Sequence, residues 1–459
     1  MAFLGPVFWV IVLLGIMIIV HELGHYWAAV ACGVKVETFS LGFGPRLFGF
    51  RRGETDFRVS AILFGGYVRM LGDLPAGMAP DSNEASPATS ESRSWGRTVQ
   101  FDPRSLQTKP RWQRFIVIAA GPFMNVVLAV VIVTGLYMYG FPKPVDTTNP
   151  EVTIVAPNSP AAKAGVQPGD KIVGIAGKKS PTWDDIFNKV AFNANRSLPI
   201  VVDRHGQDLR LTIVPKMDPQ YGMGEAGWSG AQDVEIMRVL AGSPAAAAGF
   251  QPGDRLLKIN GQPILSAKTI RQTEIHSKGK PVALTYARNG KTNTVSVKPE
   301  PNDSKQLPWR IGILAGAKVK TQIVQLPLPQ AFVQSLDFTK ENAGMIFKVL
   351  GSLIERRVSS KAIAGPIGIA QISNEAAQAG AITFLLLMAL ISVNLAIVNL
   401  LPIPILDGGT LLMLIVEMLL QREVSIQVKE TIFKLGFVFL VMVVVFVIYN
   451  DISRILMQG

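Results

Sequence analysis

Two histidines and a glutamate lie within five residues of an apolar stretch near the start of the chain. The segment His21-Glu22-Leu23-Gly24-His25 places its histidines four positions apart. On a helix such histidines share one face, where both imidazoles can reach one zinc ion, and the glutamate between them can act as base toward a water on the metal. Ionisable groups inside a spanning helix are costly and normally functional. The segment therefore predicts an intramembrane zinc site with His21 and His25 as ligands and Glu22 as the base.

A catalytic zinc needs a third protein ligand, and Asp407 is the candidate that remains. The single cysteine, Cys32, has no partner for a cysteine-rich site, and His205 and His276 lie in a distant polar region. Asp407 follows Pro402 and Pro404 in another apolar stretch and precedes Gly408 and Gly409, so the helix should break there and free backbone groups for an extended peptide. The alternative is that Asp407 only caps a helix.

The elements that must position these residues are membrane-spanning helices. Of 459 residues, 49% are hydrophobic and 17% charged, against about a quarter charged in soluble domains. Four stretches are long and apolar enough to span a bilayer, approximately Pro6–Val34, Phe115–Phe141, Ala381–Leu420 and Phe433–Asn450. The first has no cleavage site and is interpreted as a retained span. Despite a net charge of +12, no basic tract is interleaved with aromatics, which argues against nucleic acid and favours the lipid bilayer as partner.

The distribution of basic residues predicts the orientation of the spans. Lysine and arginine accumulate in the connection between the first two spans, Lys35–Arg114, which is therefore expected to be cytoplasmic. Within it, Phe39–Met70 predicts a β-hairpin at or in the membrane face, and Leu74–Ser105 has the composition of a flexible linker. The long region between spans two and three should then lie outside. Its last part, Gln330–Val358, predicts a pair of amphipathic helices on the membrane surface.

An internal repeat occupies the outer region. Ser159–Gly177 recurs as Ser243–Gly261 with a period of 84 residues, which favours two small tandem domains. Each copy predicts a short helix, a Pro-Gly-Asp turn and a strand, and the pattern resembles PDZ domains of bacterial envelope proteases. The resemblance implies small β-domains that take an extended peptide against a sheet edge. The alternative is that the copies only pack or block access.

The motifs together resemble the site-2 protease family, in its RseP type with two tandem PDZ domains. The resemblance rests on HELGH, on Asn399–Gly408 as Asn-x-x-Pro…Leu-Asp-Gly, on Gly121-Pro122…Asn125 and on the repeat. It implies that His21, His25 and Asp407 hold Zn²⁺ and that Glu22 serves as general base and acid. The substrate-binding residues would then be Asn399, Pro402, Gly42, Phe43, Gly44, Gly65, Gly66 and Tyr67, the last six in a membrane-associated β-loop that pairs with the substrate.

The family also implies a reaction, substrates and a location. The expected enzyme is a zinc metalloendopeptidase of the bacterial inner membrane that cleaves transmembrane segments of single-span proteins after an earlier site-1 cut. Expected partners are an anti-sigma factor of envelope stress signalling and remnant signal peptides, with the PDZ pair as size filter or substrate reader. Two other interpretations stay open: a zinc transporter with outer peptide-binding domains, and a membrane-tethered PDZ scaffold with a structural metal.

The predicted fold class is a polytopic α-helical membrane protein with four transmembrane helices and a metalloprotease core, two periplasmic PDZ-like α+β domains and a membrane-associated β-hairpin. The predicted division is 1–34 for the first span, 35–114 for the hairpin and linker, 115–141 for the second span, 142–221 and 222–310 for the PDZ domains, 311–380 for an amphipathic connector, 381–420 for the third span and 433–452 for the fourth.

Overall fold

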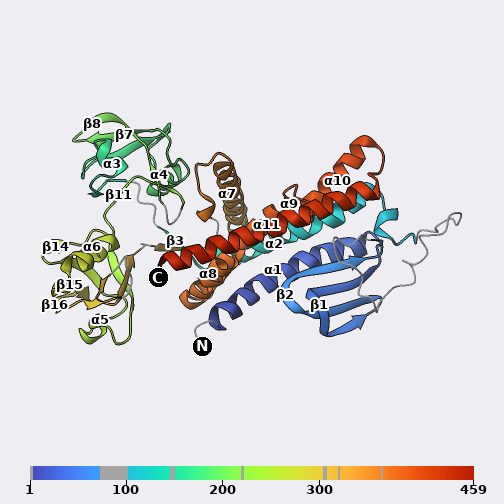
Figure 1. Cartoon of the computed structure of the whole chain (residues 1–459), viewed down its shortest axis with the longest axis horizontal. Coiled ribbons are helices and arrows are strands. Elements are labelled where there is room, and N and C mark those ends of the chain that lie inside the picture. Colours follow the sequence, from blue (N-terminus) through green and yellow to red (C-terminus); the bar gives the residue numbers. More distant parts are fainter. Residues whose placement is uncertain are drawn as a thin grey trace. The chain divides into compact units, whose positions relative to one another are not determined.

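The computed structural model describes residues 4–72, 102–144, 150–218, 222–302, 308–318, 321–362 and 365–458 (Figure 1). Most of the predicted linker, Leu74–Ser105, lies outside these residues. The chain forms two compact units, each described here by itself. One comprises Met1–Phe141, Gln325–Phe347 and Ala364–Asp451, and the other comprises Pro142–Val324, Lys348–Ile363 and Ile452–Gly459.

Four of the described helices are long and apolar enough to cross a membrane. They are α1 (Leu4–Ala31), α2 (Arg111–Tyr139), α9 (Ala381–Leu400) and α11 (Ile426–Gln458). Only 6% of the apolar window of α11 is buried, against 28–39% for the other three, so its apolar side chains face outward. The prediction of four spanning helices is thus confirmed in length and composition.

The predicted third span is two helices rather than one. Helix α9 ends at Leu400, and α10 (Asp407–Leu420) begins after a six-residue turn. Pro402 and Pro404 cannot donate backbone hydrogen bonds, and Ile405 adopts a φ of +84°, which no helix allows. The turn folds tightly onto α10, because a Cβ on Gly408 would lie 2.2 Å from the Leu401 carbonyl oxygen. The break was predicted from these residues, but the single range 381–420 was wrong.

Helices α1 and α2 cross at close range. A Cβ on Gly24 would lie 2.3 Å from the carbonyl oxygen of Ala120, so only glycine allows this approach. Toward the other end of α1, Leu13 and Met17 are fully buried and belong to one cluster with Phe384 and Met388 of α9. The crossing therefore fixes α1 against α2 at the level of the predicted zinc ligands.

The hairpin consists of β1 (Val36–Arg52) and β2 (Thr55–Met70), and both strands bend back on themselves. Residues 36–41 pair with residues 66–70 on one side and with residues 55–59 on the other, while residues 46–52 pair with residues 55–60. The hairpin therefore forms a small twisted sheet beside α1 (Figure 1), in which residues 66–70 are an outer edge. A hairpin was predicted for Phe39–Met70, and the structure begins it three residues earlier.

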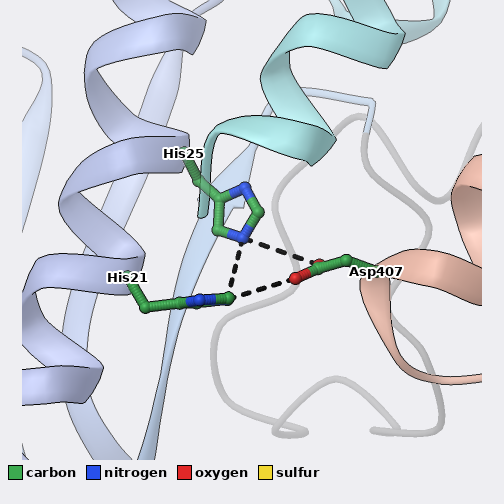
Figure 2. Close-up of side chains that lie close together, drawn as sticks. All are labelled: His21, His25 and Asp407. Carbon is green, nitrogen blue, oxygen red and sulfur yellow. Dashed lines mark hydrogen bonds and ion pairs between the residues drawn. The ribbon is translucent and has the colours of Figure 1, made fainter. Parts of the chain in front are cut away.

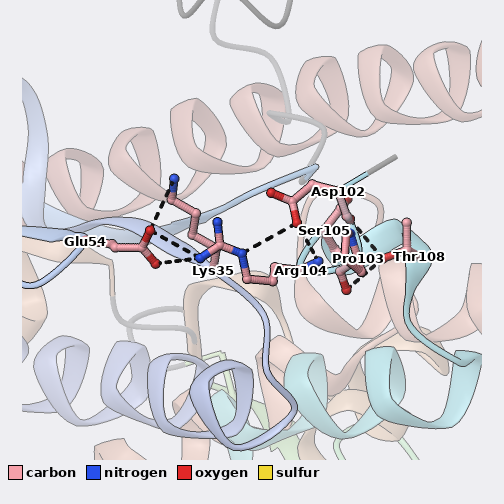
Figure 3. A network of polar contacts seen from close by, with 7 residues as sticks. All are labelled: Lys35, Glu54, Asp102, Pro103, Arg104, Ser105 and Thr108. Carbon is pink, nitrogen blue, oxygen red and sulfur yellow. Dashed lines mark hydrogen bonds and ion pairs between the residues drawn. The ribbon is translucent and has the colours of Figure 1, made fainter. Parts of the chain in front are cut away.

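A polar network ties the base of the hairpin to the segment that leads into α2 (Figure 3). Arg104 places Nη1 2.9 and 3.2 Å from the two carboxylate oxygens of Glu54, and Lys35 lies 3.8 Å from the same group. The backbone N–H of Lys35 also donates to the Arg104 carbonyl at 3.0 Å. The short 3₁₀ helix η1 (Leu106–Thr108) follows. These contacts hold the sheet close to the start of α2.

The first repeat domain (residues 150–230) is a small β-structure. Its main sheet has the strand order β6-β5-β7-β8, and a second pair joins β11 to β4. Its elements are β4 (Ile154–Val155), α3 (Pro160–Lys163), β5 (Lys171–Ile175), β6 (Lys178–Lys179), α4 (Trp183–Ala191), β7 (Leu198–Arg204), β8 (Gln207–Ile213), β9 (Lys216–Met217), β10 (Gly224–Glu225) and β11 (Trp228–Ser229).

The second repeat domain (residues 232–317) follows the same plan. Its sheet has the order β16-β15-β13-β12-β19, so β19 is an edge strand. Its elements are β12 (Val234–Val239), α5 (Pro244–Ala247), β13 (Arg255–Ile259), β14 (Gln262–Pro263), α6 (Ala267–Ser277), β15 (Val282–Arg288), β16 (Lys291–Val297), β17 (Glu300–Pro301), β18 (Trp309–Arg310) and β19 (Ile313–Ala317).

The two repeat domains share a buried ion pair that the sequence analysis did not identify. Asp170 is 1% exposed and accepts two hydrogen bonds from Arg204, at 2.7 and 2.8 Å. Asp254 and Arg288 repeat this pairing 84 residues later, at 2.6 Å for both bonds. In each domain the pair joins the Pro-Gly-Asp turn to the end of a long strand.

Three predicted boundaries need correction. The first repeat domain extends past residue 221, because β11 pairs with β4 at its start. The second extends past residue 310, because β19 pairs with β12. The predicted helix pair within Gln330–Val358 is one continuous helix, α7 (Leu328–Ile354), since its glycines do not interrupt the helical hydrogen bonds. The remaining elements are β3 (Phe141–Pro144), β20 (Thr321–Val324), η2 (Ser360–Ala362) and α8 (Pro366–Ala379).

Candidate metal centre

Three side chains from two helices converge on one point (Figure 2). His21 and His25 come from one face of α1, and their Nε2 atoms lie 3.2 Å apart. Asp407, the first residue of α10, places Oδ2 3.2 Å from Nε2 of His21 and Oδ1 3.6 Å from Nε2 of His25. The sequence separates these residues by more than 380 positions, and the fold brings their ligand atoms within 4.8 Å of one another.

The geometry of this cluster fits a zinc ion. Zinc bonds of about 2.0–2.1 Å in a tetrahedron place neighbouring ligand atoms roughly 3.3 Å apart. The three separations of 3.2, 3.2 and 3.6 Å are close to that value. Both histidines are 8% exposed, so the donors are shielded from water while Asp407 remains partly accessible. Two imidazoles and a carboxylate are also the ligand types that zinc takes.

Helix α2 orients both imidazoles. Nδ1 of His25 lies 2.9 Å from the Val117 carbonyl oxygen, so it carries the proton and leaves the lone pair on Nε2. Nδ1 of His21 lies 3.1 Å from the side-chain amide of Asn125. The amide orientation that presents Oδ1 to this Nδ1–H leaves Nε2 of His21 free for a metal as well. The Ser392 hydroxyl of α9 donates to the Asn125 backbone carbonyl at 2.8 Å and so supports that residue.

Gly121 leaves the space that the cluster needs. A Cβ at this position would lie 2.2 Å from Nε2 of His25 and 2.8 Å from Nε2 of His21. Both distances are far below an ordinary contact of 3.4–4 Å. Helix α2 therefore passes directly behind the two ligand atoms, and only a glycine permits this.

Glu22 lies between the cluster and the outer edge of the hairpin. Its carboxylate accepts a hydrogen bond from the backbone N–H of Val68 in β2. A Cβ on Gly66 would lie 3.1 Å from Cγ of Glu22, so the strand passes close to this side chain. In a strand, N–H groups two residues apart point the same way, so the outward-facing N–H groups of residues 66–70 lie along the candidate centre.

The other predicted substrate-binding residues are only partly placed near this centre. Gly66 is close, as described. Phe43 and Tyr67 stack with ring centroids 6.0 Å apart, and the positive φ angles of Gly42, Gly44 and Gly65 belong to the bends of the same sheet. Asn399 is half-buried in the last turn of α9, and Pro402 is exposed in the turn before Asp407. Neither belongs to the described contacts of the three ligand candidates.

Comparison with known proteins agrees with this site and fold. A model of peptidase family M50 matches residues 9–443. The regulator of sigma-E protease RseP of Salmonella typhimurium is 32% identical, covering 97% of this chain and 98% of its own, and that of Escherichia coli has the same identity and coverage. The Haemophilus influenzae regulator of sigma E protease is 31% identical over 99% and 100% of the two chains. The chain therefore belongs to peptidase family M50, the site-2 proteases, as the motifs predicted.

The repeat region has similarity to solved domains. The PDZ domain of an SdrC-like protein from Listeria monocytogenes is 27% identical, covering 18% of this chain and 87% of that domain, with a TM-score of 0.17. The corresponding domain from Listeria innocua is 29% identical, covering 18% and 92%, with a TM-score of 0.16.

Proposed function

We propose that this protein is a zinc endopeptidase that cleaves peptide bonds inside or beside transmembrane segments. The observation that carries the proposal is the convergence of His21, His25 and Asp407 beside Glu22, in helices apolar enough to lie in a membrane. Membership of family M50 supports peptidase chemistry, and a relative from Neisseria meningitidis carries the words zinc metalloprotease in its name.

His21, His25 and Asp407 would hold the zinc. A bound zinc supplies Lewis-acid chemistry, which polarises a carbonyl and lowers the pKa of a water. Glu22 then takes a proton from the attacking water and returns it to the leaving amine. Val117 and Asn125 keep the two imidazoles in the orientation that leaves both Nε2 lone pairs available.

The substrate would bind as a strand. A helical segment hides its carbonyl groups in hydrogen bonds, so it must unwind before hydrolysis. The outer edge of residues 66–70 offers backbone N–H and C=O groups next to Glu22, which suits addition of an extended segment. Asn399 and Pro402 flank the turn before Asp407 and would contact the same segment from the opposite side.

The biological setting follows from the relatives. Those from Salmonella and Escherichia coli are named regulators of sigma-E protease. We place this chain in the inner membrane, with the hairpin on the cytoplasmic face and both repeat domains in the periplasm. Its substrates would be single-span proteins already shortened by another protease, an anti-sigma factor and remnant signal peptides among them. The repeat domains would act as PDZ domains that limit substrate size or read substrate ends.

The decisive experiment combines metal content with cleavage. Glu22→Gln keeps the shape of the side chain and all three ligands, so the purified variant should retain zinc and lose cleavage of a model transmembrane substrate. His21→Ala, His25→Ala and Asp407→Asn should lower the zinc-to-protein ratio. The matched control is His276→Ala, an exposed histidine of the second repeat domain. Cleavage by Glu22→Gln at the parent rate would overturn the hydrolytic assignment.

A further inference from the structure

The second repeat domain carries a buried acid at the end of its open sheet edge. Glu274 of α6 is 5% exposed, and its Oε1 accepts a hydrogen bond of 2.9 Å from the backbone N–H of Ile311. Ile311 is fully buried and lies between β18 and β19. Burial raises the pKa of the Glu274 carboxyl, and the Ile311 N–H and the nearby Arg271 oppose that rise.

The position of this contact relative to β19 is what gives it a function. Strand β19 pairs with β12 on one side only, so its other edge is open to an added strand. A peptide that adds antiparallel to β19 ends with its carboxyl terminus at the first residues of that strand, next to Ile311. Backbone N–H groups in such a turn are the groups that capture a terminal carboxylate.

The turn before β19 has its hydrogen-bonding groups already assigned. The carbonyl oxygen of Ile311 accepts from Ala245, and that of Gly312 accepts from Leu240, both at 2.9 Å. The Ile311 N–H points the other way, toward α6, and there it meets Glu274. A terminal carboxylate entering this turn would find the donor occupied and the Glu274 oxygens in its place.

The first repeat domain provides an internal comparison. The residue one period of 84 positions before Glu274 is Val190, in the matching helix α4. Val190 is also 5% exposed, so the two positions are equally buried but differ in chemistry. The turn that corresponds to residues 311–312 is Ala226–Gly227, because Gly227 and Gly312 make the same close approach to Ser159 and Ser243. The acid is therefore a property of the second domain alone.

We propose that Glu274 is a built-in substitute for a peptide's terminal carboxylate, so that the second repeat domain rejects free carboxyl termini and binds extended internal segments along β19. This deepens the proposed role of the repeat domains in reading substrates. Because the test is a binding measurement in a Glu22→Gln background, it does not depend on proteolysis and can fail separately from the proposed function.

The test compares two peptides on the full-length protein in detergent. The probes are one fluorescein-labelled octapeptide ending in valine, with either a free carboxylate or a carboxamide, and binding is followed by fluorescence polarisation. Hydrogen–deuterium exchange of segments 309–317 and 224–229 identifies which domain is occupied. With Glu274 present, the carboxylate peptide should not bind segment 309–317 more tightly than the carboxamide. Glu274→Val, which copies the first domain, should bind the carboxylate peptide there at least tenfold more tightly than the parent.

A second variant separates occupancy from folding. Glu274→Gln keeps the hydrogen bond to Ile311 and should bind the carboxylate peptide more weakly than Glu274→Val does. If Glu274→Val unfolds, a Glu274→Gln chain that still rejects the carboxylate supports the occupied turn. The proposal is overturned if the parent already prefers the carboxylate at segment 309–317. It is equally overturned if folded Glu274→Val gains no such binding.

Discussion

Gly121 gives the sharpest test of the metal centre, because a single methyl group should abolish it. In Gly121→Ala the new Cβ would sit 2.2 Å from Nε2 of His25, about 1.2 Å short of ordinary contact. The helices cannot separate to make room, since Gly24 of α1 already lies against the Ala120 backbone of α2. The imidazoles must therefore move instead.

The size of that movement sets the expected loss. Metal sites tolerate departures of about 0.2 Å from ideal bond lengths, and His25 must withdraw by several times that distance. Losing orientation alone typically lowers metal affinity 10–100-fold, so losing His25 as a ligand should cost at least about 100-fold. Overpacking should also destabilise the helix pair by about 1–3 kcal/mol.

The assay is zinc competition with a chelator of known affinity, followed by cleavage of the model substrate. Gly135→Ala in the same helix is the matched control, because a Cβ there meets nothing within 4 Å. It should leave zinc affinity and cleavage unchanged. If Gly121→Ala holds zinc within threefold of the parent and cleaves at the parent rate, the close passage of α2 behind the ligands is wrong.

Three further predictions concern other parts of the chain. Asp170→Asn should destabilise the first repeat domain by about 2 kcal/mol, because a buried ion pair is broken and the partner keeps its charge. Arg204 lowers the pKa of Asp170, so this stability is present at neutral pH and is lost as acid protonates the group below its unfolded pKa of about 3.9. Acid unfolding curves of the parent and variant should therefore converge, and parallel curves would contradict the pairing. Ile405→Gly should relieve about 1 kcal/mol of strain at the positive φ, measured as a higher Tm, together with slower cleavage because the turn before Asp407 loosens. A lower Tm would disprove the strain. Asn125→Ala should weaken zinc binding about 10–100-fold, whereas Asn394→Ala on the exposed face of α9 should not.

The residues that do chemistry were predictable, and those that orient them were not. HELGH and Asp407 are conspicuous because ionisable groups are rare in apolar helices, so their convergence could be expected. The roles of Val117 and Gly121 depend on how closely α1 and α2 cross, which no spacing within one helix encodes. The domain boundaries failed for a related reason: β11 and β19 are short strands that return to the start of their own domains, and their partners lie far away in sequence.

The distance along the chain between the histidine pair and Asp407 has a consequence for biogenesis. Ribosomes add about 5–20 residues per second, so on the order of half a minute separates the synthesis of α1 from that of α10. During this interval the first helix must sit in the bilayer with its two imidazoles and its glutamate lacking their third partner. Zinc loading is consequently a late event, and a nascent chain that has not reached residue 407 has no complete centre with which to cut its neighbours.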